Sequence, residues 1–157
     1  CGSGNFLTET YISLRKLENE ALRSLSDQIM LGDVTNPIQV SIGQFYGIEI
    51  NDFAVTVAKT ALWIAESQMM QETEKLVRHT LDFLPLRSYA NIVEGNALRL
   101  DWESVVPKQK LNYIMGNPPF VGARIMDAGQ KADVSIIFEK WKNIGKLKKE
   151  TWITGKK

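Results

Sequence analysis

Two stretches with helical periodicity alternate with short apolar runs along this chain, and that alternation most strongly limits how the chain can fold. Apolar residues recur at helical spacing over residues 3–25 and again over residues 53–79. Residues 45–50, 91–95 and 111–116 are short runs of the kind that forms buried strands. The order is helix, strand, helix, strand, loop, strand. Strands that alternate with helices predict an α/β fold with a parallel sheet.

The residues that flank these stretches agree with the predicted boundaries. Ser3 or Asn5 can cap the first helix, and Asn51 or Asp52 can cap the second. Residues 28–44 contain glycine and proline among polar side chains, which predicts a long loop.

Composition places the chain among ordinary globular domains. Its 157 residues are 44% hydrophobic and 24% charged, enough for one domain with a core of its own. The sequence shows neither an apolar run of membrane-spanning length nor a start that resembles a signal peptide. A single cysteine, Cys1, cannot form an internal disulfide, so we expect a cytoplasmic protein. The single histidine, His79, argues against a histidine-rich metal site, and no metal ligands are predicted.

Charge is distributed unevenly between the two ends of the chain. Residues 1–120 hold 14 acidic and 10 basic side chains, whereas residues 121–157 hold 4 acidic and 9 basic ones. We place a boundary after residue 138, with a folded domain over 1–138 and a basic, poorly ordered tail over 139–157. The tail is either a solvated end or a surface that contacts phosphates. Residues 133–141 fit a helix or a strand equally well.

Several residues with useful chemistry directly follow predicted strands or open a helix. In parallel sheets, ligands bind at the carboxyl ends of the strands. Gly2 and Gly4 allow a ligand to approach the backbone at a helix N-terminus. Glu49 can accept both hydroxyls of a ribose, and Asn96 offers an amide suited to a purine edge. Together these residues describe a nucleoside-shaped ligand.

A stiff corner, Asn117-Pro118-Pro119-Phe120, follows the last predicted strand. Proline fixes its own φ and drives the preceding residue toward extended geometry. The corner therefore holds an amide and an aromatic ring at its two ends. Such a corner either separates a strand from a loop or holds a flat, hydrogen-bonding substrate.

In this order, these motifs resemble those of class I S-adenosylmethionine-dependent methyltransferases, specifically the N6-adenine DNA methyltransferases. The resemblance is greatest to the large bacterial restriction–modification enzymes that join methylation and cleavage on one chain. Four segments carry it, "CGSGNFL", "QFYGIEINDFAVTVAKTALWIAESQM", "NIVEGNAL" and "NYIMGNPPF", and it extends from residue 1 to about residue 138.

The resemblance implies a Rossmann-like fold with an S-adenosylmethionine site. Gly2 and Gly4 would line the methionine part of that cofactor, and Phe6 would form a wall of its pocket. Glu49 would hold the ribose hydroxyls, with Ile50 against the adenine ring.

The same resemblance assigns the remaining site residues. Asn96 and Ala97 would contact the adenine edge of the cofactor, where many relatives carry Asp in place of Asn96. Asn117 and the Pro118 carbonyl would accept hydrogen bonds from the amine of a target adenine flipped out of double-stranded DNA, and Phe120 would stack on the base.

Parts of the methyltransferase fold are not found in these 157 residues. They include the first strand, which lies in the centre of the sheet, the later strands, the target-recognition region and any nuclease. From this we expect a partial fold that is unstable, self-associates or pairs its remaining strands differently, and that binds the cofactor weakly or not at all.

Two other functions remain open at this point. Glutamine-modifying methyltransferases also carry Asn-Pro-Pro, usually followed by Tyr, so the acceptor could be a protein glutamine. The chain could also be an inactive remnant that binds DNA nonspecifically, in which case binding would fall steeply with salt and would not need a cofactor.

Overall fold

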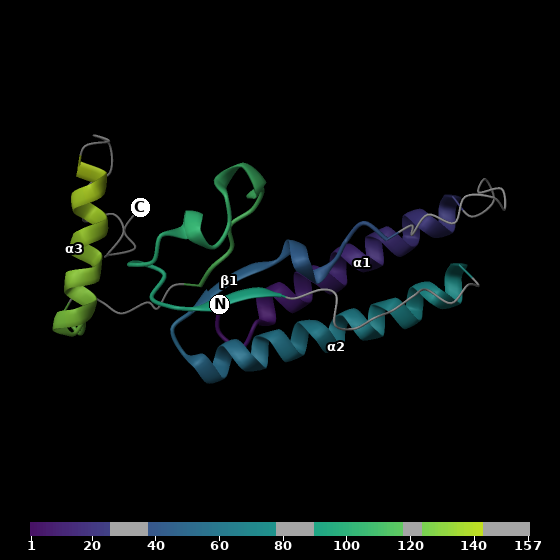
Figure 1. Ribbon diagram of the computed structural model, residues 1–157, viewed down its shortest axis with the longest axis horizontal. Coiled ribbons are helices and arrows are strands. Elements are labelled where there is room, and N and C mark those ends of the chain that lie inside the picture. Colours follow the sequence, from purple (N-terminus) through teal and green to yellow (C-terminus); the bar gives the residue numbers. More distant parts are fainter. Residues whose placement is uncertain (26–37, 78–89, 118–123, 143–157) are drawn as a thin grey trace.

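The computed structural model of the chain describes residues 1–25, 38–77, 90–117 and 124–142. Its helices and strands are α1 (Asn5–Leu25), β1 (Tyr46–Glu49), α2 (Asp52–Val77), β2 (Asn91–Glu94) and α3 (Ala128–Lys142), with single turns of 3-10 helix at Ile42–Gln44, Trp102–Ser104 and Lys108–Lys110 (Figure 1). The two helices and two strands predicted before residue 96 are confirmed.

The two strands form a small parallel sheet, with Tyr46 opposite Asn91 and Glu49 opposite Glu94. The crossover between them contains α2, which begins where Asn51 accepts a hydrogen bond from the Ala54 N–H at 3.0 Å. That bond confirms Asn51 as the helix cap. The α/β class with a parallel sheet is therefore confirmed, while a complete Rossmann-like sheet stays a prediction.

The strand predicted over residues 111–116 is wrong. Residues 111–117 adopt no regular secondary structure, and Tyr113, Ile114 and Met115 are 87%, 66% and 51% exposed. A strand forms only where a neighbour supplies the other half of the hydrogen-bond ladder. Within the described residues, β1 and β2 pair only with each other. No described strand therefore lies beside residues 111–117 to supply the other half of a ladder.

The C-terminal part of the described chain contains one further helix, α3. Residues 133–141 belong to α3, so the choice between helix and strand is decided in favour of helix. That helix continues past the predicted boundary at residue 138 and ends at Lys142. Residues 143–157, most of the predicted tail, lie outside the described residues.

The core lies between α2, α1 and the sheet. Its buried side chains are Tyr11, Ile42, Val55, Ala58, Leu62, Ala65, Met69, Ala90 and Ile92. On α2 these residues recur at spacings of three and four, which is one face of a helix. Met69 is thus a core residue, whereas Trp63, on another face of α2, is 42% exposed and not part of the core.

A buried polar cluster joins α1 to α2, which run side by side in the same direction (Figure 1). Arg15 is fully buried; its guanidinium pairs with Glu18 and donates to the Thr73 hydroxyl at 2.7 Å. Thr73 also lies 2.7 Å from the Asn19 side-chain oxygen. Glu18 accepts the N–H groups of residues 39–40 as well. The cluster therefore fixes the register of the two helices.

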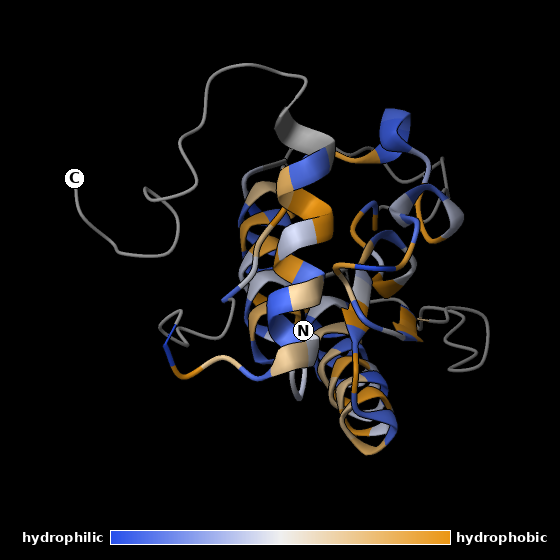
Figure 2. Ribbon diagram, turned by 90° about the vertical axis from the view of Figure 1, so that its left-hand side faces the viewer, coloured by the Kyte–Doolittle hydropathy of each residue, from blue (hydrophilic) through white to orange (hydrophobic). Residues whose placement is uncertain are grey.

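At the other end of the molecule, α3 stands beside the loops that leave the sheet (Figure 1). Figure 2 views the molecule from the α3 side and shows hydrophobic and hydrophilic residues mixed around this helix. None of the described helices combines the length and the apolar character needed to cross a membrane.

Candidate functional site

The first four residues form a turn that brings the chain into α1. Gly2 and Gly4 have φ values of 62° and 85°, a region that glycine occupies without strain. The Gly4 carbonyl accepts the Thr8 N–H at 2.8 Å, which starts the helix. A Cβ at Gly4 would lie 2.8 Å from the Ala58 Cβ, so the turn packs tightly against α2. A Cβ at Gly2 would meet no atom within 4 Å, so the space beside this glycine is open.

Glu49, the last residue of β1, binds this turn. Its Oε2 accepts the Gly2 N–H at 2.6 Å and the Cys1 amino group at 2.9 Å, and its Oε1 accepts the Asn51 N–H at 3.2 Å. The hydrogen bond from the Cys1 amino group, together with those from Gly2 and Asn51, lowers the pKa of Glu49 to about 2. Glu49 is therefore an anion at neutral pH, held at the carboxyl end of its strand.

The loop after β2 begins at the same edge of the sheet. The Gly95 N–H donates to the Glu49 carbonyl at 2.8 Å, which ties the two strand ends together. Asn96 follows; its Oδ1 accepts the Leu98 N–H at 2.9 Å. The Ala97 carbonyl accepts the indole N–H of Trp102 at 2.7 Å. The glycine turn, Glu49 and the 96–97 loop thus lie along one edge, as predicted.

Two apolar side chains predicted to contact the cofactor are largely uncovered. Phe6, in the first turn of α1, is 55% exposed, and Ile50, directly after Glu49, is 67% exposed. Both side chains leave apolar surface available to a ligand.

The predicted catalytic corner is only partly within the described residues. Asn117 is exposed at the end of residues 111–117. The Thr10 hydroxyl lies 3.9 Å from the Met115 sulfur, so this segment passes the first turns of α1. Pro118, Pro119 and Phe120 lie outside the described residues, as does His79. The roles of the corner therefore stay predictions.

Comparison with known proteins identifies the family. The sequence model described as "MmeI, DNA-methyltransferase domain" matches residues 1–155. This chain belongs to that family. DNA methyltransferase A of Bacillus subtilis (strain 168) is 43% identical over 150 residues, which are 94% of this chain and 17% of that protein. The resemblance to restriction–modification DNA methyltransferases is thereby confirmed.

A solved member of the MmeI family has the same fold. The structure of the Type IIL restriction–modification enzyme MmeI in complex with DNA is 40% identical in sequence and matches with a TM-score of 0.79. The match covers 94% of this chain and 19% of MmeI. The chain thus spans about a fifth of the length of these two proteins.

One cluster at the edge of the predicted site was missed by sequence reasoning. Asp133 of α3 is 7% exposed; its carboxylate accepts the Asn96 side-chain N–H at 2.7 Å and the Arg99 Nε–H at 2.5 Å. The Arg99 and Asn96 hydrogen bonds lower the pKa of Asp133. No motif signals this contact, because Asp133 and Asn96 are 37 positions apart.

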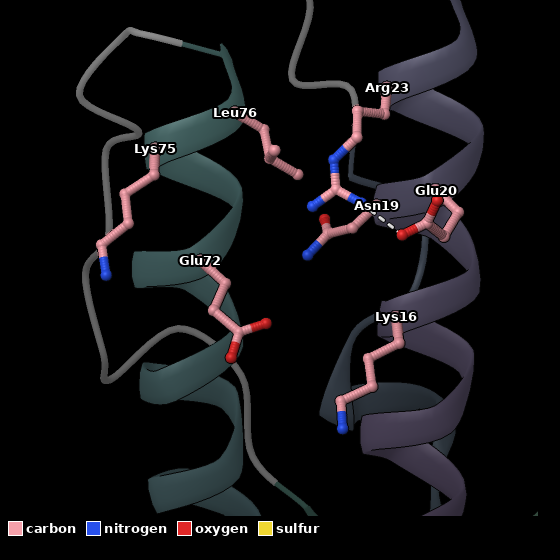
Figure 3. A pocket seen from close by; sticks show the side chains of 7 residues that line it. All are labelled: Lys16, Asn19, Glu20, Arg23, Glu72, Lys75 and Leu76. Carbon is pink, nitrogen blue, oxygen red and sulfur yellow. Dashed lines mark hydrogen bonds and ion pairs between the residues drawn. The ribbon is translucent and has the colours of Figure 1, made fainter.

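A groove between α1 and α2 lies outside this site. It encloses about 350 Å³ and is lined by Lys16, Asn19, Glu20, Arg23, Glu72, Lys75 and Leu76 (Figure 3). Its charges are mixed, and the lining includes none of the residues predicted for the MmeI-family site. Among the described residues, no group of three or more His, Cys, Asp or Glu side chains is placed to hold a metal ion.

Proposed function

We propose that this chain is the cofactor-binding and catalytic part of an adenine-specific DNA methyltransferase of a restriction–modification system. It would transfer a methyl group from S-adenosylmethionine to N6 of an adenine flipped out of double-stranded DNA. The observation that carries the proposal is the meeting of the Gly2 turn with Glu49 at the carboxyl edge of a parallel sheet, in a chain of the MmeI DNA-methyltransferase family.

The residues present fit S-adenosylmethionine. Glu49 Oε1 accepts one N–H, from Asn51, so it retains an acceptor position for a ribose hydroxyl. Open space adjoins Gly2, and Phe6 and Ile50 offer uncovered apolar surface for the rest of the molecule. When bound, S-adenosylmethionine supplies an electrophilic methyl group on a sulfonium.

The catalytic work proposed for this chain is positioning. Asn117, with the Pro118 carbonyl, accepts the N–H groups of the adenine amine and directs the nitrogen lone pair toward the methyl carbon, while Phe120 stacks on the base. On accepting the methyl group the adenine amine would release one proton, which would pass to water. The base must leave the duplex, because a paired amine cannot be reached.

The family match favours DNA over the two alternatives. Both relatives are described by DNA methylation or by restriction–modification with bound DNA. A protein glutamine as acceptor and an inactive remnant with nonspecific DNA affinity have no observation in their favour, and they become outcomes of the test.

The test is transfer of labelled methyl groups by the full natural chain that contains these residues. Double-stranded DNA is incubated with methyl-labelled S-adenosylmethionine, and its nucleosides are separated. We expect label in N6-methyldeoxyadenosine only. The Asn117→Ala variant should retain cofactor affinity and lose transfer by more than about 100-fold, whereas Glu49→Ala should lose cofactor affinity.

The matched control is Asn112→Ala, which changes another exposed asparagine in the same segment and should transfer normally. Label on another base, or on a glutamine-containing peptide and not on DNA, would reverse the assignment. Salt-sensitive DNA binding without any transfer would identify an inactive binding module.

A further inference from the structure

The carboxylate of Asp133 bridges two side chains that leave the sheet at the cofactor edge. Asn96 Nδ2 lies 2.7 Å from Oδ2, and Arg99 Nε lies 2.5 Å from Oδ1. Asp133 is 7% exposed, whereas the Arg99 side chain is 58% exposed. One loop therefore supplies the donors to both carboxylate oxygens of Asp133. A buried carboxylate without such donors would destabilise the fold.

This bridge decides which way the Asn96 amide faces. Its Oδ1 accepts the Leu98 N–H at 2.9 Å while its Nδ2 donates to Asp133. A half-turn of the amide would set NH₂ against an N–H donor and an oxygen against a carboxylate, and both contacts would be repulsive. One N–H of Nδ2 and one lone pair of Oδ1 remain, and they point in fixed directions.

Without Asp133, Asn96 Nδ2 loses the carboxylate that accepts its N–H. The Leu98 N–H alone would hold Asn96 Oδ1, and Nδ2 would turn to water. The surrounding loop is otherwise well held, since the Asn96 carbonyl accepts the Arg99 and Leu100 N–H groups, each at 2.9 Å. Loss of Asp133 should therefore free the side chain of Asn96 more than it disturbs the backbone.

We propose that Asp133 is a positioning residue for the cofactor's adenine subsite, acting through the side chain of Asn96. Resting on the proposed function, this inference gives α3, the helix that follows the Asn117–Phe120 corner in the chain, a part in cofactor binding. Arg99 supplies the opposite charge that pairs with this carboxylate.

The test measures binding of S-adenosylhomocysteine by calorimetry in the full natural chain that contains these residues. We expect Asp133→Ala and Asn96→Ala each to weaken binding about tenfold, the equivalent of one well-placed hydrogen bond. The double variant should bind no more weakly than either single variant, because both changes remove the same contact. In turnover, Asp133→Ala should raise KM for S-adenosylmethionine and leave kcat within about twofold.

The matched control is Asp127→Ala, at the residue before α3. Asp127 accepts the Gln130 N–H at 2.7 Å at the start of α3, so loss of this side chain tests the helix without touching Asn96. Asp133→Asn replaces Asp133→Ala should the alanine variant not fold. Losses of affinity that add in the double variant, or an equal loss in Asp127→Ala, would make Asp133 merely structural and overturn the proposal.

Wild type and Glu49→Ala separate this proposal from the proposed function. If the wild type binds and Glu49→Ala does not, while Asp133→Ala binds like the wild type, only the role of Asp133 fails. If the wild type does not bind S-adenosylhomocysteine, the cofactor assignment fails and the inference fails with it.

Discussion

Gly4 shows how a single hydrogen in place of a methyl group sets the geometry at the carboxyl edge of the sheet. Its φ of 85° and the 2.8 Å that would separate a Cβ from the Ala58 Cβ both exclude a side chain. Gly2 has a similar φ but open space around it. The two glycines therefore separate backbone strain from crowding.

We expect Gly4→Ala to lower the free energy of unfolding by about 3 kcal/mol, because the left-handed backbone and the overpacking against α2 both oppose a methyl group. Gly2→Ala is the matched control and should cost about 1 kcal/mol from strain alone. Urea unfolding of both variants provides the measurement, and equal losses would show that contact with Ala58 does not matter.

The Glu49 carboxylate predicts a pH dependence of stability. Its pKa lies at about 2 in the folded chain, against an ordinary value of 4.5. A pKa that folding depresses adds stability above the ordinary value, and this stability is lost as pH falls toward the folded value. The contribution of Glu49 is therefore lost between about pH 4.5 and pH 2.

The measurement compares the urea midpoints of wild type and Glu49→Gln from pH 2 to pH 7. Other carboxyl groups titrate in both proteins and cancel in the difference. The gap between the two free energies of unfolding should be constant above about pH 5 and should close toward pH 2. A gap that does not change with pH would contradict the assigned ionic role.

At the scale of elements, α1 and α2 are joined by polar contacts inside an otherwise apolar interface. Replacing Thr73 by Val keeps the shape but removes the hydroxyl that Arg15 reaches at 2.7 Å. Because Arg15 is fully buried, its N–H would lose a partner that water cannot replace. We expect a loss of about 2–3 kcal/mol in the free energy of unfolding.

Thr60→Val is the matched control on the same helix. Thr60 is exposed, and its hydroxyl bonds only the Thr56 carbonyl one turn earlier, at 2.9 Å. This change should stay within about 0.5 kcal/mol. Similar losses in the two valine variants would mean that the buried cluster does not hold the helices together.

The whole molecule presents apolar surface along residues 111–117. Tyr113 is 87% exposed and Ile114 is 66% exposed, in a run whose composition suits a strand. Extended apolar segments without a partner pair with other chains. We expect the 157-residue chain to self-associate as its concentration rises, and Tyr113→Lys with Ile114→Lys to reduce this association.

Sedimentation velocity over a range of concentrations measures this association. Leu17→Lys, which removes a 66% exposed leucine on α1, is the control and should leave the association unchanged. A wild type that remains monomeric at high concentration, or a Leu17→Lys variant that alone becomes monomeric, would place the association elsewhere or exclude it.

Much of the fold was predictable from local sequence. The helical spacing of apolar residues, which on α2 includes Met69, the cap at Asn51 and the short apolar runs are all local patterns. They were sufficient to predict α1, α2 and both strands. The positions of Gly2, Glu49 and Asn96 at strand ends or before a helix likewise predicted that they gather at one edge. The family resemblance rests on the same short motifs.

Contacts between distant residues were decided only by the tertiary structure. The run at 111–116 has the composition of a strand, but a strand also needs a neighbouring ladder, which a local pattern cannot supply. Asp133 looks like an ordinary helix residue until folding sets it against Asn96, 37 positions away. By itself, the sequence determined the elements and the chemistry available at their ends; packing decided which elements pair and which side chains meet, because both depend on distances that sequence spacing does not encode.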